Sequence, residues 1–303
     1  MSYSISSIML NLTIGVFGER AFINELGKKS TVNDMSIHHH YDSTHVFTFV
    51  ASNSDKIQPL MQALQMAEVP ILVLRELTPQ VGEEIIGLSE MNFEKGFTIL
   101  DGFPEDKYRN LIKGTSLEKF EIIGKNVGEV YEKLMAVQIK RGTDVIVPID
   151  NFFNVKGIGT VILGVIRSGT VNKYDTLILE PLGKDATIKG IQIQDKDFNI
   201  AEPGSRVGFN LKDIDVSDLR RGQILSNKPL TKIAKLPNKI LKNKFYKSDV
   251  KDNEQVIVSS GLQCAVAVVR GNELTLDKEI VAQKPILVAS TKQESLRIIG
   301  RVE

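Results

Sequence analysis

A run of short, β-branched strands separated by glycines constrains the fold of this chain more than any other feature. It spans Asp150–Leu177 and reads DNFFNVKGIGTVILGVIRSGTVNKYDTL. Only glycine reaches positive φ, or lets a neighbouring backbone approach closely, without a steric cost, so each glycine marks a bend. The bends fall at Gly157, Gly159, Gly164 and Gly169. The pattern predicts a small Greek-key β-barrel, a shape that by itself hosts many functions.

The blocks that follow this run occur in an order that resembles a known family. They are IKGIQ from Ile188, AEPGSRVG from Ala201 and RRGQIL from Arg220. Together with the glycine-rich run they resemble the second domain of the translational GTPases, the elongation factor Tu superfamily. In that family this barrel binds the aminoacyl end of tRNA and docks on the ribosome. The resemblance therefore implies tRNA or the ribosome as a partner.

Strands and helices alternate along the chain before the barrel. Such alternation predicts βα units and a parallel, doubly wound sheet, the P-loop-GTPase-like α/β fold that the resemblance implies. The expected strands are Leu10–Gly18, His45–Val50, Val69–Leu74, Gly96–Leu100 and Phe120–Ile123. The expected helices are a short one with Phe22, Ile23 and Leu26 on one face, then Ile57–Leu64, Val81–Leu88, Tyr108–Ile112 and Val127–Ala136.

No helical pattern follows Val137, and a Lys-Pro pair near Asn227 divides the remainder into two all-β parts. The second part ends in LRIIGRV, which resembles the last strand of the family's third domain, as in the selenocysteine-specific elongation factor and the initiation factor 2 gamma subunit. We therefore expect an α/β domain at 1–138, a domain 2 barrel at 139–227 and a domain 3 barrel at 228–303. Because the chain stops at Glu303, we expect no further C-terminal domain of the selenocysteine factor.

The phosphate loop of the family is missing. That loop, Gly-x-x-x-x-Gly-Lys-Ser/Thr, wraps phosphates with backbone N–H groups and holds magnesium with its hydroxyl. Here Gly18 is followed only by Glu19, Arg20 and Ala21 before the short helical face begins. The sequence Gly27-Lys28-Lys29-Ser30 comes too late to replace the loop, and we interpret it as a glycine helix cap followed by solvated lysines.

Three other nucleotide motifs are also replaced. Ala51-Ser52-Asn53-Ser54-Asp55 stands where the family has Asp-x-x-Gly and a catalytic histidine. Asp101-Gly102-Phe103-Pro104 replaces the guanine-reading Asn/Thr-Lys-x-Asp, and Gly124-Lys125-Asn126 replaces Ser-Ala-Lys. Little phosphoryl-transfer catalysis remains without positioning and charge stabilisation. We therefore expect no catalytic residues and no GTP or magnesium cofactor, and we interpret the first domain as a degenerate GTPase fold.

The histidines and the cysteine offer little chemistry. His38-His39-His40 lacks the spacing and the cysteine partner of a zinc site, so we expect a polar edge strand or loop and no metal. Cys264 lies in the alternating run from Cys264 to Val269, which indicates a small structural residue and not a nucleophile. A single cysteine also fits a reducing compartment.

Charge points to one local patch. Lysine and arginine number 38 against 37 aspartates and glutamates, so any nucleic-acid contact must be local, and we expect no DNA partner. Eight lysines lie between Lys228 and Lys251 against one acidic residue, Asp249. Such a patch serves either as an RNA phosphate contact or as a solvated face. The candidate RNA-binding residues are Lys239, Lys242, Lys244, Arg206, Arg220 and Arg221.

The chain contains no apolar stretch long enough for a membrane span, and the start MSYSISSIML has no secretory pattern. These features predict a cytoplasmic protein without a membrane partner. The combined prediction is a translation elongation factor-like protein that binds tRNA or a ribosomal partner and has lost GTP binding. Two alternatives stay open: a divergent active GTPase, and a non-enzymatic regulatory subunit that mimics a GTPase and binds a translation-factor protein.

Overall fold

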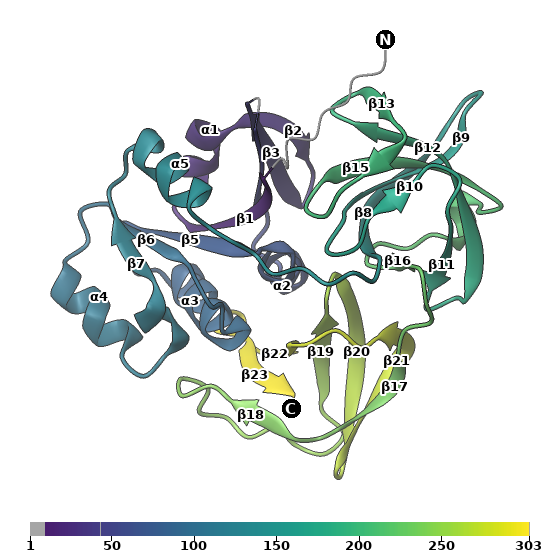
Figure 1. Cartoon of the computed structure of the whole chain (residues 1–303). Helices are drawn as coiled ribbons and strands as arrows, with labels where there is room; N and C mark the ends of the chain where they lie inside the picture. The colour runs from purple at the N-terminus through teal and green to yellow at the C-terminus, as the bar shows by residue number, and fades with distance from the viewer. Residues whose placement is uncertain (1–9, 43, 303) are drawn as a thin grey trace.

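The computed structural model describes residues 10–42 and 44–302, which form an α/β unit, a closed β-barrel and an open half-barrel. The three parts meet around helix α2 (Ile57–Met66), as Figure 1 shows. In that view the α/β unit is purple to teal, the barrel is teal to green and the half-barrel is green to yellow. This is the fold class that the sequence predicts.

The first sheet is mixed, with an antiparallel pair at one edge of a parallel core. Its strands, in spatial order, are β2 (Lys28–Val32), β3 (Met35–Tyr41), β4 (His45–Ser52), β1 (Leu10–Gly18), β5 (Val69–Leu74), β6 (Phe97–Leu100) and β7 (Glu121–Ile123). From β4 to β7 neighbouring strands are parallel, whereas β3 is antiparallel to β2 and β4. β5 is buried at every position, as expected of a strand that is covered on both faces.

Helices cover both faces of this sheet. α2, α3 (Pro79–Met91) and α4 (Glu105–Ile112) pack on one face, and α1 (Ile23–Leu26) and α5 (Val127–Met135) pack on the other. The sequence sets where α3 and α5 begin. Thr78 precedes Pro79, the first residue of α3, and its hydroxyl accepts the N–H of Val81 (3.2 Å). The Asn126 side chain accepts two N–H groups at the start of α5. Single-turn helices η1 (Arg20–Phe22) and η2 (Ser116–Lys119) complete the unit.

The second part is a closed barrel. Its strands are β8 (Ile146–Val155), β9 (Gly159–Val165), β11 (Thr176–Glu180), β12 (Lys184–Ile193), β13 (Lys196–Phe198), β15 (Arg206–Lys212) and β16 (Ile224–Ser226), with the short pair β10 (Val171–Asn172) and β14 (Ile200–Ala201) and the single turn η3 (Val216–Asp218) beside them. The order is β11-β16-β8-β9-β15-β12, and pairing of β11 with β12 closes the ring.

The glycines of the barrel fill the positions that the sequence predicts for them. Gly157, Gly159 and Gly169 have φ of 81°, 103° and 70°, where side chains are strained. Gly164 instead allows a close approach, because a Cβ there would lie 2.4 Å from the carbonyl oxygen of Pro148.

The third part is a curved sheet whose two edges do not pair with each other. Its strands, in spatial order, are β17 (Lys232–Pro237), β21 (Glu273–Val281), β20 (Gln263–Arg270), β19 (Gln255–Ser260), β22 (Ile286–Ser290), β23 (Ile298–Val302) and β18 (Ile240–Lys242). The expected second barrel is thus a half-barrel among the described residues. Its Leu262, Leu287, Ala289 and Ile298 belong to the same apolar core as α2 and α3.

Both β units hold α2 by its polar groups. The Gln62 and Gln65 amides donate to the backbone oxygens of Leu262 (2.9 Å) and Pro285 (2.8 Å) in the half-barrel. From the barrel, Arg167 donates to the backbone oxygens of Gln65 (2.9 Å) and Met66 at the end of the helix. A guanidinium at a helix C-terminus satisfies carbonyls that have no helical partner. α2 is therefore fixed from two sides.

Candidate functional site

The carboxyl end of the parallel strands is the expected ligand site of such a sheet, and the residues after β1 make a tight turn there. Strand β1 ends at Gly18, whose φ is 79° and where a Cβ would lie 2.0 Å from the Val73 carbonyl oxygen. The next residue, Glu19, donates its N–H to the same oxygen (2.9 Å). The chain then enters η1, whose Phe22 is buried, and the four-residue α1. No long loop remains here to wrap a phosphate.

A carboxylate from α3 lies against this turn. Glu84 is 1% exposed. Its Oε2 accepts the Gly18 N–H (2.5 Å), and its Oε1 accepts Nε and Nη2 of Arg20 (both 2.9 Å). Burial raises the pKa of Glu84, while Arg20 and the Gly18 N–H oppose that shift. The chain's own anion thus satisfies the groups at the end of β1.

A hollow of about 330 Å³ opens beside Glu84, and its charges disfavour a polyphosphate. Four carboxylates line it against two guanidiniums, so the lining carries two more negative charges than positive ones. A polyphosphate ligand would enter against like charge, which is unfavourable when partly desolvated. The charged residues that line the hollow are Glu19, Asp55, Glu76, Glu84, Arg20 and Arg75.

Residues at the ends of β6 and β7 pair with each other. The Lys125 Nζ donates to Asp101 Oδ2 (2.9 Å), and this contact lowers the pKa of Asp101 and raises that of Lys125. The same ammonium lies 5.8 Å from the centroid of the Phe22 ring. Asp101 and Lys125 belong to the two segments in which the sequence lacks the expected guanine-reading motifs, and their side chains pair with each other.

Gly27 and the histidines differ from the sequence-based expectation. Gly27 is the C-cap of α1, but it is extended (φ −177°) and not left-handed, and strand β2 begins at the next residue. The glycine is needed because a Cβ would lie 2.9 Å from the backbone oxygen of His39. His38–His40 belong to β3, between β2 and β4, and are not a loop or an edge. His38 is 2% exposed, and its Nδ1 lies 3.0 Å from the Gly27 oxygen.

The paired strands β2 and β3 thus occupy the segment between α1 and β4, where the sequence analysis expected only a polar edge strand or loop around His38–His40. Within residues 10–42 and 44–302, no group of three or more histidine, cysteine, aspartate or glutamate side chains could hold a metal ion.

Acidification is expected to destabilise the fold through His39. Burial, helped by Arg206 and His38, lowers its pKa from 6.5 to about 4. The unfolded chain therefore takes up the proton first, so the stabilisation is complete above pH 6.5 and is lost as the pH falls through about 4. The loss should be roughly 2 to 3 kcal/mol. Urea unfolding of the parent and of His39→Gln between pH 7 and 4 measures it.

The variant should show a shallower acid dependence, and His45→Gln, at the end of the same β3–β4 connection, is the control. An acid dependence that is the same in His39→Gln and in the parent would contradict the assignment.

The three arginines predicted to face RNA have partners in the chain. Arg206 is 9% exposed at its side chain and pairs with Asp150 through both terminal nitrogens. Arg220 donates to the backbone oxygens of Ser217 (2.8 Å) and Leu219 (2.6 Å). Arg221 pairs with Asp34 (2.8 Å) in the turn between β2 and β3 and so joins the barrel to the α/β unit.

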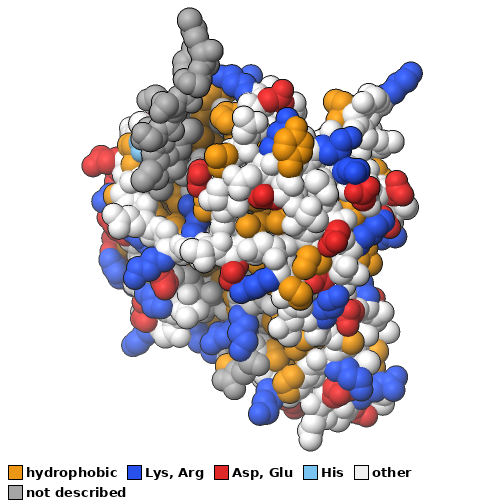
Figure 2. Space-filling view, turned by 45° about the vertical axis from the view of Figure 1, so that its right-hand side comes forward, with side chains coloured by type: hydrophobic (Ala, Val, Ile, Leu, Met, Phe, Trp, Pro, Cys, Tyr) orange, Lys and Arg blue, Asp and Glu red, His pale blue; other side chains and the backbone are white. Residues whose placement is uncertain are grey.

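Half of the lysine patch is neutralised by carboxylates. Lys228, Lys232, Lys235 and Lys242 form ion pairs with Asp144, Glu180, Glu273 and Asp249. Lys244 donates to the backbone oxygen of Lys113 and lies over the Phe245 ring. Among the described residues, Lys239, Lys247 and Lys251 have no carboxylate partner. On the face shown in Figure 2, basic and acidic side chains are interspersed.

Cys264 lies in β20, half-buried, on the same face as Val266 and Val268, as the alternation predicts. The fully buried face of that strand is the other one, which carries Ala265 and Ala267. Burial raises the pKa of the Cys264 thiol to about 11. A thiol with such a pKa is a poor nucleophile at neutral pH.

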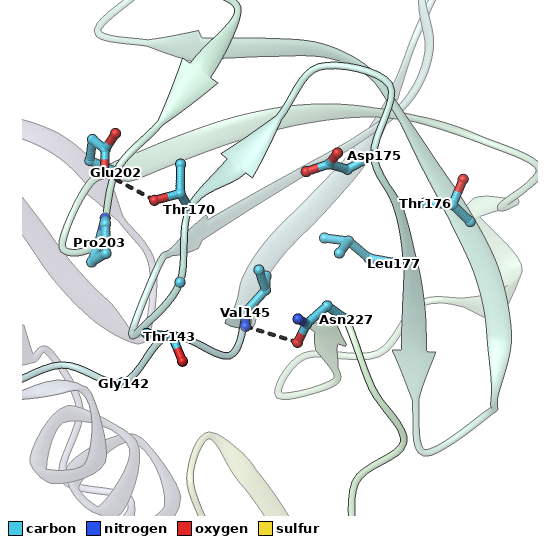
Figure 3. A pocket seen from close by; sticks show the side chains of 11 residues that line it. Gly142, Thr143, Val145, Thr170, Asp175, Thr176, Leu177, Glu202, Pro203 and Asn227 are labelled. Carbon is cyan, nitrogen blue, oxygen red and sulfur yellow. Dashed lines mark hydrogen bonds between the residues drawn. The ribbon is translucent and has the colours of Figure 1, made fainter.

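A second hollow, of about 600 Å³, lies at one end of the barrel (Figure 3). On one side of it the Thr170 hydroxyl donates to Glu202 (3.1 Å), and elsewhere in the lining Asn227 accepts the N–H of Val145 (3.0 Å). Glu84 and this hollow were both missed from the sequence. No local signal marks them, because each depends on segments brought together from distant parts of the chain.

The described part of the chain contains no helix that is long and apolar enough to cross a membrane.

The family model for elongation factor Tu domain 2 matches residues 159–226. An uncharacterized protein of Methanocaldococcus jannaschii is 34% identical over 96% of this chain and 99% of its own length. The selenocysteine-specific elongation factor of the same organism is 30% identical over 66% of this chain, which spans only 42% of that factor.

Among solved structures, the translation elongation factor SelB of Methanococcus maripaludis, in complex with the GTP analogue GppNHp, superposes with a TM-score of 0.81. It is 20% identical, and the match covers 97% of this chain and 79% of the SelB chain. This likeness shows that the two proteins share a fold.

Proposed function

We propose that this chain, which belongs to the translational GTPase superfamily, is an elongation factor-like protein that binds tRNA or a ribosomal partner without binding or hydrolysing GTP. The Glu84 carboxylate carries the proposal. It accepts the Gly18 N–H and the Arg20 guanidinium at the position where a phosphate would have to bind. A phosphate cannot use these donors while Glu84 holds them. The Asp101–Lys125 pair supports the loss of guanine binding in the same way, because each side chain is engaged by the other.

GDP and GTP are expected to bind with dissociation constants above about 10 µM, a binding free energy weaker than roughly 7 kcal/mol. The reason is that phosphate and base positions are both engaged by side chains of the chain itself. Calorimetric titration in the presence of magnesium measures this. The M. maripaludis factor described in complex with GppNHp is the positive control. Tight binding by the parent chain would favour the alternative of a divergent GTPase.

The partner half of the proposal rests on the lysine patch. Binding to tRNA should weaken steeply with salt, because each neutralised phosphate contributes about 0.7 to 0.9 to the log–log slope. Changing Lys239, Lys247 and Lys251 to glutamine should flatten the slope by about 2 to 3. The fold should be unaffected, since solvated lysines contribute little to stability. Filter binding or fluorescence anisotropy at several salt concentrations gives the slopes.

A triple variant at Lys29, Lys107 and Lys140, which are exposed lysines of the α/β unit and its linker, is the matched control. Absence of tRNA binding in the parent, or equal slopes in the two triple variants, would favour the remaining alternative. In that case the chain is a regulatory subunit whose partner is a translation-factor protein.

A further inference from the structure

We propose that the turn after β1 is a latent oxyanion site that the chain keeps closed with its own ligand, the Glu84 carboxylate. The ligand class is a single small oxyanion such as inorganic phosphate. This inference deepens the proposed function and rests on it, since it identifies what occupies the phosphate position.

The donors are arranged as in a built anion site. The Gly18 N–H points at Glu84 Oε2 from a residue whose positive φ and tight surroundings exclude any side chain. Arg20 supplies two N–H groups to the other oxygen. Charge-assisted hydrogen bonds of this kind are about twice as strong as neutral ones. These donors recognise negative oxygen and do not distinguish a carboxylate from a phosphate.

The carboxylate itself is buried at the wall of a hollow. Glu84 is 1% exposed, whereas the hollow of about 330 Å³ lies immediately beside it. Gly18, Arg20 and Glu84 all line that hollow, so removing the carboxylate would free the Gly18 N–H and two N–H groups of Arg20 toward it. The lining would also lose one of its four negative charges. An anion from solution would then reach the Gly18 N–H and the Nε and Nη2 of Arg20, while Asp55 keeps its 3.7 Å contact with Arg20 Nη1. Buried donors are costly to leave unsatisfied.

The neighbouring carboxylate explains why Glu84 holds its place. Glu83 pairs with Arg297 of the half-barrel through both oxygens (3.0 Å and 2.5 Å). α3 is therefore tied to the half-barrel by one glutamate and presents the next one to the end of β1. The contact between Glu84 and the end of β1 is thus supported by the packing of the α/β unit against the half-barrel.

The test is Glu84→Ala, assayed by thermal unfolding and calorimetry with inorganic phosphate against chloride at matched ionic strength. The variant should bind phosphate with a dissociation constant near about 1 mM and at least ~100-fold more tightly than the parent. Glu76→Ala, which removes an exposed carboxylate from the same hollow, should behave as the parent. Adding Arg20→Gln to Glu84→Ala should abolish the phosphate binding.

A folded Glu84→Ala that does not bind phosphate would overturn the inference. If the variant does not fold in chloride, acetate or phosphate should restore a cooperative unfolding transition, and failure of both to do so would equally overturn it. Titration of the Glu84→Ala variant with GDP tests the loss of the base site separately from the oxyanion site. GDP binding to the variant more than ~10-fold tighter than phosphate would contradict the loss of the base site, while the oxyanion site would stand. GTP binding by the parent would contradict the proposed function.

Discussion

Replacing Arg206 with alanine is expected to lower the free energy of unfolding by about 3 to 5 kcal/mol, because it leaves a buried carboxylate without its counter-charge. The partner is Asp150, whose side chain is only 3% exposed and accepts both terminal nitrogens of Arg206. The pair joins β8 to β15 outside the barrel core, which holds the neighbouring residues Ile149 and Val207. Urea unfolding followed by circular dichroism measures the change.

Arg220→Ala is the matched control, since that guanidinium donates only to backbone oxygens in a turn. Its cost should stay within about 1 kcal/mol. The double variant Asp150→Leu/Arg206→Met should recover much of the loss, because apolar replacement of a buried ion pair is often neutral. If Arg206→Ala keeps the parental stability and loses tRNA binding, the arginine faces RNA and its pairing with Asp150 is dispensable.

The elements that the sequence predicts well are those with a local signal. The strand patterns and the glycine bends of the barrel each follow from a few adjacent residues, and their positions match the structure. Hydrophobic periodicity and glycine spacing are therefore sufficient to predict the order of these elements.

The elements that the sequence does not predict depend on distant partners. Strand β2 reads KKSTV, which has no apolar alternation, and it forms because β3 pairs with it. His38 looks solvent-facing among three histidines, yet the backbone oxygen of Gly27 satisfies it. Glu84 is one of several glutamates on α3, and only the fold brings it to Gly18, 66 residues away in sequence. Burial of polar groups is decided by tertiary contacts that spacing does not encode.

The attachment of the half-barrel to the α/β unit also depends on a contact between residues distant in sequence, the ion pair of Glu83 and Arg297. Arg297→Ala is expected to destabilise the protein by about 3 to 5 kcal/mol. Glu83 is 3% exposed at its side chain and accepts the backbone N–H of Arg297 (2.5 Å) together with its guanidinium. The same guanidinium donates to the backbone oxygen of Asp55 (2.8 Å). Removing it leaves a buried carboxylate between two units that share one apolar core.

Arg301→Ala tests whether burial sets this cost. Arg301 pairs with Glu90 of the same helix (2.8 Å), but its side chain is 37% exposed against 16% for Arg297. Glu90 is only 8% exposed at its side chain, but removing the more exposed Arg301 opens it to water, so the loss should be smaller, about 1 to 2 kcal/mol. Unfolding free energies of the two variants, measured in urea at neutral pH, decide the point. Equal losses would mean that helix α3 is held to β23 by its apolar contacts alone, and that the Glu83–Arg297 pair only accompanies them.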